Sequence, residues 1–240
     1  MRSSLRAFAL IFALAPLARA AAPKNSCIAC HRAATAVPSL EHTFDEWAES
    51  SHAKAGVNCE ICHGGDPSRP GQAEAHAGIL SSTDPKSKVY YTAIPGTCGA
   101  CHAAELAAFK ASVHYSVLMK TGRGPDCLSC HGAMADTVIE PRYMEMTCTL
   151  CHRTPTQAYS ARMAVEDARA ALRGYESAAA TAENAGAARR QDRALRERLK
   201  ALLVEWHGFD AAKVRAGAIE LARDAAAARG ALKPKKPAPK

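Results

Sequence analysis

The sequence predicts a mainly α-helical and irregular fold, and three observations lead to this prediction. Large apolar side chains are scarce, because 53 of the 240 residues are Ala and 10 are Cys within a hydrophobic share of 48%. A chain this poor in large side chains stays partly unfolded or packs around something other than peptide. No segment shows the alternating pattern of a strand, and from about Thr156 apolar residues recur at helical spacing.

All ten cysteines fall into five copies of one motif, C-x-x-C-H. This motif is the attachment signature of c-type haem: two thiols bond to the vinyl groups of one porphyrin, and the following His is the proximal iron ligand. The sequence therefore predicts five covalently attached haem c groups, which supply the missing core. The predicted cofactor-binding residues are Cys27, Cys30, His31, Cys59, Cys62, His63, Cys98, Cys101, His102, Cys127, Cys130, His131, Cys148, Cys151 and His152.

Three other interpretations of the cysteines are a disulfide framework, zinc sites and a thioredoxin-like redox pair. A disulfide framework has no reason to place a His after every second cysteine. A four-cysteine zinc site would not repeat five times with that His. The repeated pattern favours haem.

The N-terminus is typical of a secretory signal. Arg2 and Arg6 form a basic start, Ala7 to Ala18 is an apolar run of 12 residues, and Ala18-Arg19-Ala20 is a small-residue cleavage site. The run is shorter than the roughly 20 residues that span a bilayer, which favours cleavage over an uncleaved anchor. We expect residues 1–20 to be a signal peptide, the mature chain to have no membrane span, and the protein to be periplasmic or otherwise extracytoplasmic.

The charge is divided unevenly along the chain. Residues 21–152 carry a formal net charge of −3, and residues 153–240 carry +8. Each ferric haem adds about −1, because two propionates outweigh the residual charge of the iron. We expect a holoprotein that is near neutral but polarised, with a basic helical surface suited to an acidic partner, an anionic membrane surface or its own haem propionates; a simple solvated face is the alternative. No motif indicates nucleic-acid binding.

The domain organisation follows from this pattern. Residues 21–155 form the predicted pentahaem domain, with room only for loops and short helices such as Phe44–Ser51 and Ala103–Leu118. Residues 156–230 form the predicted helical region, and residues 231–240 a disordered basic tail. The apolar stripes of the helical region indicate antiparallel packing of helices on each other, on the haem domain or on a second subunit. They are Val165, Ala168, Leu172, Tyr175 and Ala179; Leu195, Leu199, Leu202 and Trp206; and Val214, Ala218, Leu221 and Ala225.

Five histidines lie outside the motifs, which equals the number of distal ligands that five six-coordinate irons need. The predicted distal ligands are His42, His52, His76, His114 and His207. His207 would dock the helical region onto a haem. Which histidine serves which iron stays open. Methionine is the competing ligand and would raise the reduction potential, but gap-filling is the more usual role of Met119, Met134, Met144 and Met146.

The motifs and the element W-x-x-S-S-H…C-x-x-C-H-G-G-D, from Trp47 to Asp66, resemble the multihaem cytochrome c superfamily. That superfamily includes cytochrome c554-like carriers, pentahaem nitrite reductase, hydroxylamine oxidoreductase and octahaem tetrathionate reductase. The resemblance covers roughly residues 25–152. It implies a haem-cored fold, and in several of these enzymes long C-terminal helices pack between subunits, which implies a homo-oligomer through residues 156–229.

Two functions follow from the resemblance. The first is an electron carrier between a membrane quinol-oxidising complex or another redox partner and a terminal reductase or cytochrome. The second is a reductase or oxidase of nitrite, hydroxylamine or a sulfur oxyanion, which needs one iron with an open position. The nitrite reductases mark their catalytic haem with Lys in place of the motif His, and none of the five motifs here does so. We therefore expect the carrier, and we assign no catalytic residue.

Overall fold

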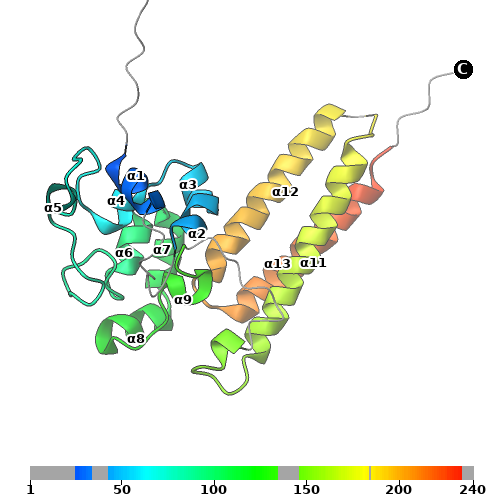
Figure 1. Ribbon diagram of the computed structural model, residues 1–240. Helices are drawn as coiled ribbons and strands as arrows, with labels where there is room; N and C mark the ends of the chain where they lie inside the picture. Colours follow the sequence, from blue (N-terminus) through cyan, green and yellow to red (C-terminus); the bar gives the residue numbers. More distant parts are fainter. Residues whose placement is uncertain (1–24, 34–42, 135–145, 184, 234–240) are drawn as a thin grey trace, which may run out of the picture.

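The computed structural model describes residues 25–33, 43–134, 146–183 and 185–233. Within these ranges the chain is helical and irregular and forms no β-strand (Figure 1), which confirms the predicted fold class. The predicted signal peptide lies outside the described residues, as does the basic tail from residue 234 onward.

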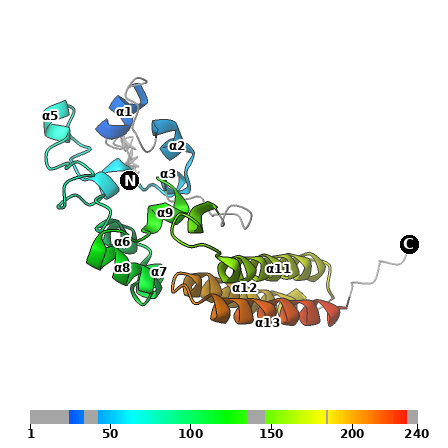
Figure 2. The same cartoon turned by 90° about the horizontal axis from the view of Figure 1, so that it is seen from below.

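The N-terminal region is a cluster of short helices joined by loops (Figures 1 and 2). Among the described residues of this region large buried side chains are few, and the buried apolar ones are Ile94, Pro95, Phe109 and Leu118. The helices are α1 (Ser26–Ala33), α2 (Phe44–Glu49), α3 (Ser51–Lys54), α4 (Cys59–His63), α5 (Gln72–Ala75), α6 (Ile94–Gly99), α7 (Ala103–Lys110), α8 (Val113–Thr121) and α9 (Cys127–His131).

Two helices predicted as continuous are each broken by a buried serine. The predicted helix Phe44–Ser51 is divided at Ser50, whose hydroxyl accepts a hydrogen bond from the backbone N–H of Ala53 at 3.1 Å. The predicted helix Ala103–Leu118 ends at Lys110, and Ser112 caps α8 in the same way. Serine satisfies an otherwise unpaired N–H at a helix start. Each break therefore begins a new helix, and that helix carries a histidine in its first turn.

The C-terminal region is a three-helix bundle of α11 (Thr156–Ala179), α12 (Ala185–Trp206) and α13 (Ala211–Gly230). Helices that follow each other in the chain are antiparallel, so α11 and α13 run in the same direction (Figure 1). The pair α11 and α13 makes the most extensive helix contact in the described part of the chain. The predicted stripes face inward as expected, because Val165, Leu195 and Leu221 are each 1% exposed.

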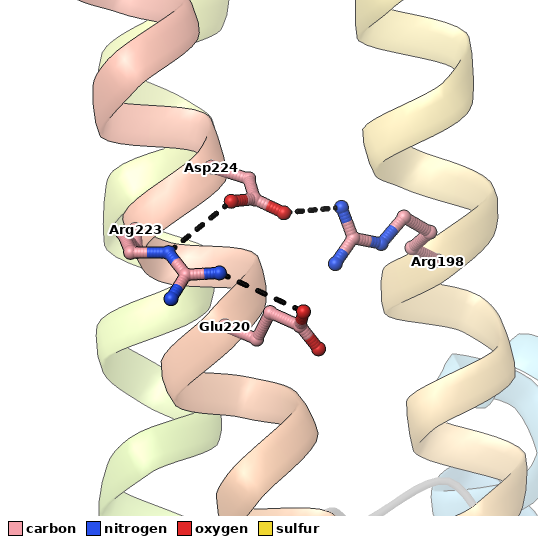
Figure 3. Close-up of polar contacts among 4 residues, drawn as sticks. All are labelled: Arg198, Glu220, Arg223 and Asp224. Carbon is pink, nitrogen blue, oxygen red and sulfur yellow. Dashed lines mark hydrogen bonds and ion pairs between the residues drawn. The ribbon is translucent and has the colours of Figure 1, made fainter.

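Polar contacts add to the apolar core of the bundle. The buried hydroxyl of Tyr175 donates to the backbone oxygen of Ala188 at 2.9 Å. On the surface, Arg198 of α12 pairs with Asp224 of α13 at 2.8 Å, and Arg223 reaches both Asp224 and Glu220 (Figure 3). The hydrogen bond from Arg198 is the main cause that lowers the pKa of Asp224.

The two regions meet where α7 lies against α12, and the turn that follows α12 completes this contact. Gly208 of this turn lies beside the backbone of Ala108 in α7. The next residue, Phe209, has a φ of 59°, in the left-handed region. Phe209 packs on Phe109 and His114 of the N-terminal region, with ring centroids 6.2 and 4.2 Å apart. None of the described helices is long and apolar enough to cross a membrane.

Candidate haem-binding sites

Each motif forms a helical turn that presents its three functional side chains on one side. Positions i, i+3 and i+4 lie on one face of a helix, so both thiols and the imidazole of C-x-x-C-H point the same way. The second and fourth motifs are the helices α4 and α9 themselves. In the third and fifth motifs the same turn is closed by backbone hydrogen bonds, from the N–H of His102 to Cys98 at 2.9 Å and from that of His152 to Cys148 at 2.8 Å.

None of the ten thiols is in a disulfide. No group of three or more metal-ligating side chains forms in the described ranges. Burial is the main cause that raises the pKa of Cys59 and of Cys130, each to about 11. These thiols are therefore neutral near pH 7.

Consecutive motifs lie next to each other in space. Helix α1 contacts α4, and Asn25 donates to Glu60 at 3.1 Å. Helix α6 contacts α9, and a hydrogen bond between the thiols of Cys98 and Cys127 raises the pKa of the first and lowers that of the second. Burial, and after it the nearby thiol of Cys148, raises the pKa of Cys130. Burial, and after it the nearby thiol of Cys98, likewise raises the pKa of Cys62, which links the second motif to the third. The motifs thus follow one another through the structure in chain order.

The central structural feature is that four motif histidines each face one non-motif histidine. The ring centroids are about 6 Å apart in every pair, and the two members come from distant parts of the chain. The pairs are His31 with His76 (6.1 Å, interplanar angle 65°), His52 with His102 (6.2 Å, 87°), His114 with His152 (5.8 Å, 81°) and His131 with His207 (6.1 Å, 13°).

These separations fit two imidazoles on opposite sides of one iron. A metal to imidazole nitrogen bond is about 2 Å long, and the ring centre lies about 1 Å beyond the nitrogen, so two axial rings have centroids about 6 Å apart. Rings in direct contact would be closer. The remaining predicted distal ligand, His42, lies outside the described residues.

Hydrogen bonds orient three of the four non-motif rings. The Nδ1 of His52 lies 2.8 Å from the backbone oxygen of Met134. The Nδ1 of His76 lies 2.8 Å from that of Gln72. The Nδ1 of His207 lies 3.0 Å from that of Leu203. A carbonyl oxygen only accepts hydrogen bonds, so each Nδ1 carries the proton and each Nε2 presents its lone pair. This is the tautomer that binds iron through Nε2, and such a hydrogen bond raises the basicity of a metal ligand.

His114 differs from the other three. Its Nδ1 is buried and has no hydrogen-bond partner among the described residues. Burial first, and the neighbouring His152 second, lower the pKa of His114. The ring is held instead by its edge-to-face contact with Phe209.

The element from Trp47 to Asp66 builds the surroundings of the second motif. The indole N–H of Trp47 donates to the backbone oxygen of Val57 at 3.1 Å, while Ser50 caps the helix that carries His52. Gly65 has a φ of 84°, and a Cβ at this position would lie 2.5 Å from the backbone oxygen of Ala75. The glycine lets the chain pass close to the segment that bears His76.

Two structural roles were not predicted from the sequence. The backbone oxygen of Met134 orients His52, a contact that no side-chain pattern signals. Phe209 covers His114, and its only signal was an aromatic residue after Gly208 in a chain with five Phe. Among the methionines considered as ligands, Met119 and Met146 are exposed and Met144 lies outside the described residues.

Comparison with known proteins gives a match to the N-terminal part of the chain. Residues 13–64 match the family model described as cytochrome c554 and c-prime. This segment holds the first two motifs and most of the element from Trp47 to Asp66. No curated protein and no solved structure gives a significant match. The matched segment is thus similar to a multihaem cytochrome c family, which is a family of c-type cytochromes with covalently bound haem that act in electron transfer.

Proposed function

We propose that the protein is an exported c-type cytochrome that holds five covalent haems and passes electrons between redox proteins. The observation that carries this proposal is the set of four histidine pairs with ring centroids about 6 Å apart. In each pair the motif histidine is the proximal ligand and the other histidine the distal one. His42 supplies the fifth distal ligand.

Two nitrogen ligands on each iron favour an electron carrier over an enzyme. Haem supplies the one-electron chemistry. The two histidines of each pair would hold the haem iron between them, so an electron could enter and leave without substrate binding. Bis-histidine ligation also lacks the methionine that raises reduction potentials, so we expect low potentials.

The contacts between consecutive motifs support a conducting path in chain order. The thiols of Cys27 and Cys59, of Cys98 and Cys127, and of Cys130 and Cys148 lie near enough to influence one another. Haems bound at these neighbouring turns would lie close together, from the first motif to the fifth. Electrons would then cross the N-terminal region without leaving the protein.

The expected partners are redox proteins outside the cytoplasm. A membrane quinol-oxidising complex or another cytochrome would donate electrons, and a terminal reductase or cytochrome would accept them. The formal charge of +8 on residues 153–240 favours a docking surface for an acidic partner. Export rests on the basic start, apolar run and cleavage site predicted in residues 1–20.

Two measurements on the purified holoprotein test the proposal. Mass spectrometry should give a chain without residues 1–20 and with five covalent haems. Electron paramagnetic resonance (EPR) of the ferric protein should show low-spin iron and no high-spin component. Fewer than five haems would contradict the cofactor assignment. A stoichiometric high-spin iron that changes on addition of nitrite or hydroxylamine would instead favour the reductase or oxidase.

A further inference from the structure

We propose that the haem at Cys148–His152 is a ligand-exchange site, at which His114 leaves the reduced iron and a neutral diatomic molecule takes its place. The inference rests on the proposed histidine ligation and assigns a binding function to one of its members. Its starting point is the contrast between His114 and the other three non-motif histidines.

Position in the helix separates His114 from His76 and His207, while His52, which is also the second residue of its helix, is bonded instead by the backbone oxygen of Met134. His76 and His207 directly follow the last residues of α5 and α12, and their Nδ1 atoms reach back to the carbonyls of Gln72 and Leu203, four residues earlier. His114 is the second residue of α8, so the residue four positions earlier, Lys110, belongs to α7. No carbonyl of its own helix is within reach.

This lack of a hydrogen bond weakens His114 as a ligand. A hydrogen bond from Nδ1 raises ligand basicity and fixes the orientation of the ring, and its loss commonly lowers metal affinity. Apart from its pairing with His152, the ring contact that holds His114 is the one with Phe209, at 4.2 Å and 78°. Among the four observed pairs, the bond from His114 to iron should therefore be the easiest to break.

The surroundings allow His114 to move. Helix α8 starts at Val113, whose side chain is 77% exposed, so the first turn lies at the surface. Phe209 holds a φ of 59°, a conformation that a non-glycine residue rarely adopts. Rotation of the His114 side chain and a small shift of this turn open the position without disturbing the core of the bundle.

The aromatic cover selects the class of ligand. Phe209 packs on Phe109, and Phe109 packs on Tyr115 with ring centroids 5.5 Å apart. An anion would lose its hydration against these rings at a high cost, whereas a neutral diatomic molecule would not. The exchange breaks one bond from His114 to iron and forms one bond from the incoming molecule to iron, with no change in electrons or protons.

Carbon monoxide is the probe, and the holoprotein reduced with dithionite is the sample. We expect carbon monoxide to bind slowly to one haem per chain, as measured by the change in Soret absorbance. In His114→Ala, uptake should stay at one haem and become fast, because the same iron is now open. In the matched control His76→Ala, uptake should rise to two haems.

The role of Phe209 has a separate readout. Phe209→Ala should speed carbon monoxide binding about tenfold, in line with the usual effect of removing a group that supports a metal ligand. Phe44→Ala, which removes a ring packed on Trp47, should leave the rate unchanged. Equal effects of the two substitutions would overturn the role assigned to Phe209.

The outcomes separate the two proposals. If the wild-type protein binds no carbon monoxide, the exchange site is overturned. The same holds if the His114→Ala protein binds carbon monoxide at two haems. Neither result contradicts the proposed carrier. High-spin iron in the ferric wild-type protein before any addition contradicts the proposed ligation itself.

Discussion

The four histidine pairs differ in the angle between their two rings, because each ring is oriented by its own place in the backbone. The rings of His131 and His207 are nearly parallel, at 13°, whereas the other three pairs are inclined by 65° to 87°. Ligand identity and orientation are means by which a protein tunes its haem, so a haem held by His131 and His207 would differ electronically from those held by the three inclined pairs.

Ring orientation gives a prediction for His207. The ferric protein should show one rhombic low-spin EPR signal from the haem between His131 and His207, beside broader signals with a large maximum g value from the inclined pairs. His207→Ala should abolish the rhombic signal and produce one high-spin iron. His76→Ala should also produce one high-spin iron but keep the rhombic signal. An undiminished rhombic signal without a new high-spin iron in His207→Ala would show that another residue binds that iron.

The sequence was sufficient to nominate candidate distal ligands, but it did not indicate which motif histidine each of them would face. The number of histidines outside the motifs matched the number of haems, so His52, His76, His114 and His207 could all be nominated. Their pairing depends on contacts between segments such as those of His52 and His102, which no local pattern encodes. The missing hydrogen bond of His114 also arises from tertiary structure, because it depends on the break between α7 and α8.

The long helices of the bundle are determined by patterns of apolar residues within each helix. The predicted stripes became the buried faces of α11, α12 and α13, because residues at helical spacing share one face. The short helices were harder to predict. Their ends depend on single capping residues such as Ser50 and Ser112, and two predicted helices were wrong in their extent for that reason.

Substitution in α13 tests the bundle core. Leu221 is 1% exposed and packs in the cluster shared by the three helices, whereas Ile219 on the same helix is 49% exposed. Leu221→Ala should lower the free energy of unfolding by about 2–5 kcal/mol through lost burial and a cavity. Ile219→Ala should change it by less than about 0.5 kcal/mol. Urea unfolding followed by far-ultraviolet circular dichroism measures both, and equal effects would mean that α13 is not packed as described.

The whole molecule combines an acidic haem-binding part with a basic helical part. Residues 21–152 and 153–240 carry −3 and +8, which leaves +5 before the haems are counted. The five proposed haems, at about −1 each, would bring the holoprotein close to zero while the separation of charge remains. The contact of α7 with α12 sets the two parts side by side (Figures 1 and 2).

This balance predicts the isoelectric point. The sequence alone gives a pI of about 9.0, but the mature holoprotein should focus near neutral pH because the propionates of five haems offset the excess of Lys and Arg. Isoelectric focusing of the purified protein, with the haem content determined on the same sample, is the measurement. A fully loaded protein that focuses near 9 would mean that the propionates are neutralised.

The place of His207 in the chain also sets an order of assembly. Three of the four pairs are complete once the chain has been synthesised as far as residue 152. The fourth pair is not, because His207, the partner of His131, follows the end of α12. Because chains are made from the N-terminus onward, the haem proposed at the fourth motif would be the last of these four to gain both histidines. A chain that stops before the end of α12 would leave that iron with one protein ligand, and the spectrum of this haem would distinguish an unfinished polypeptide from a finished one.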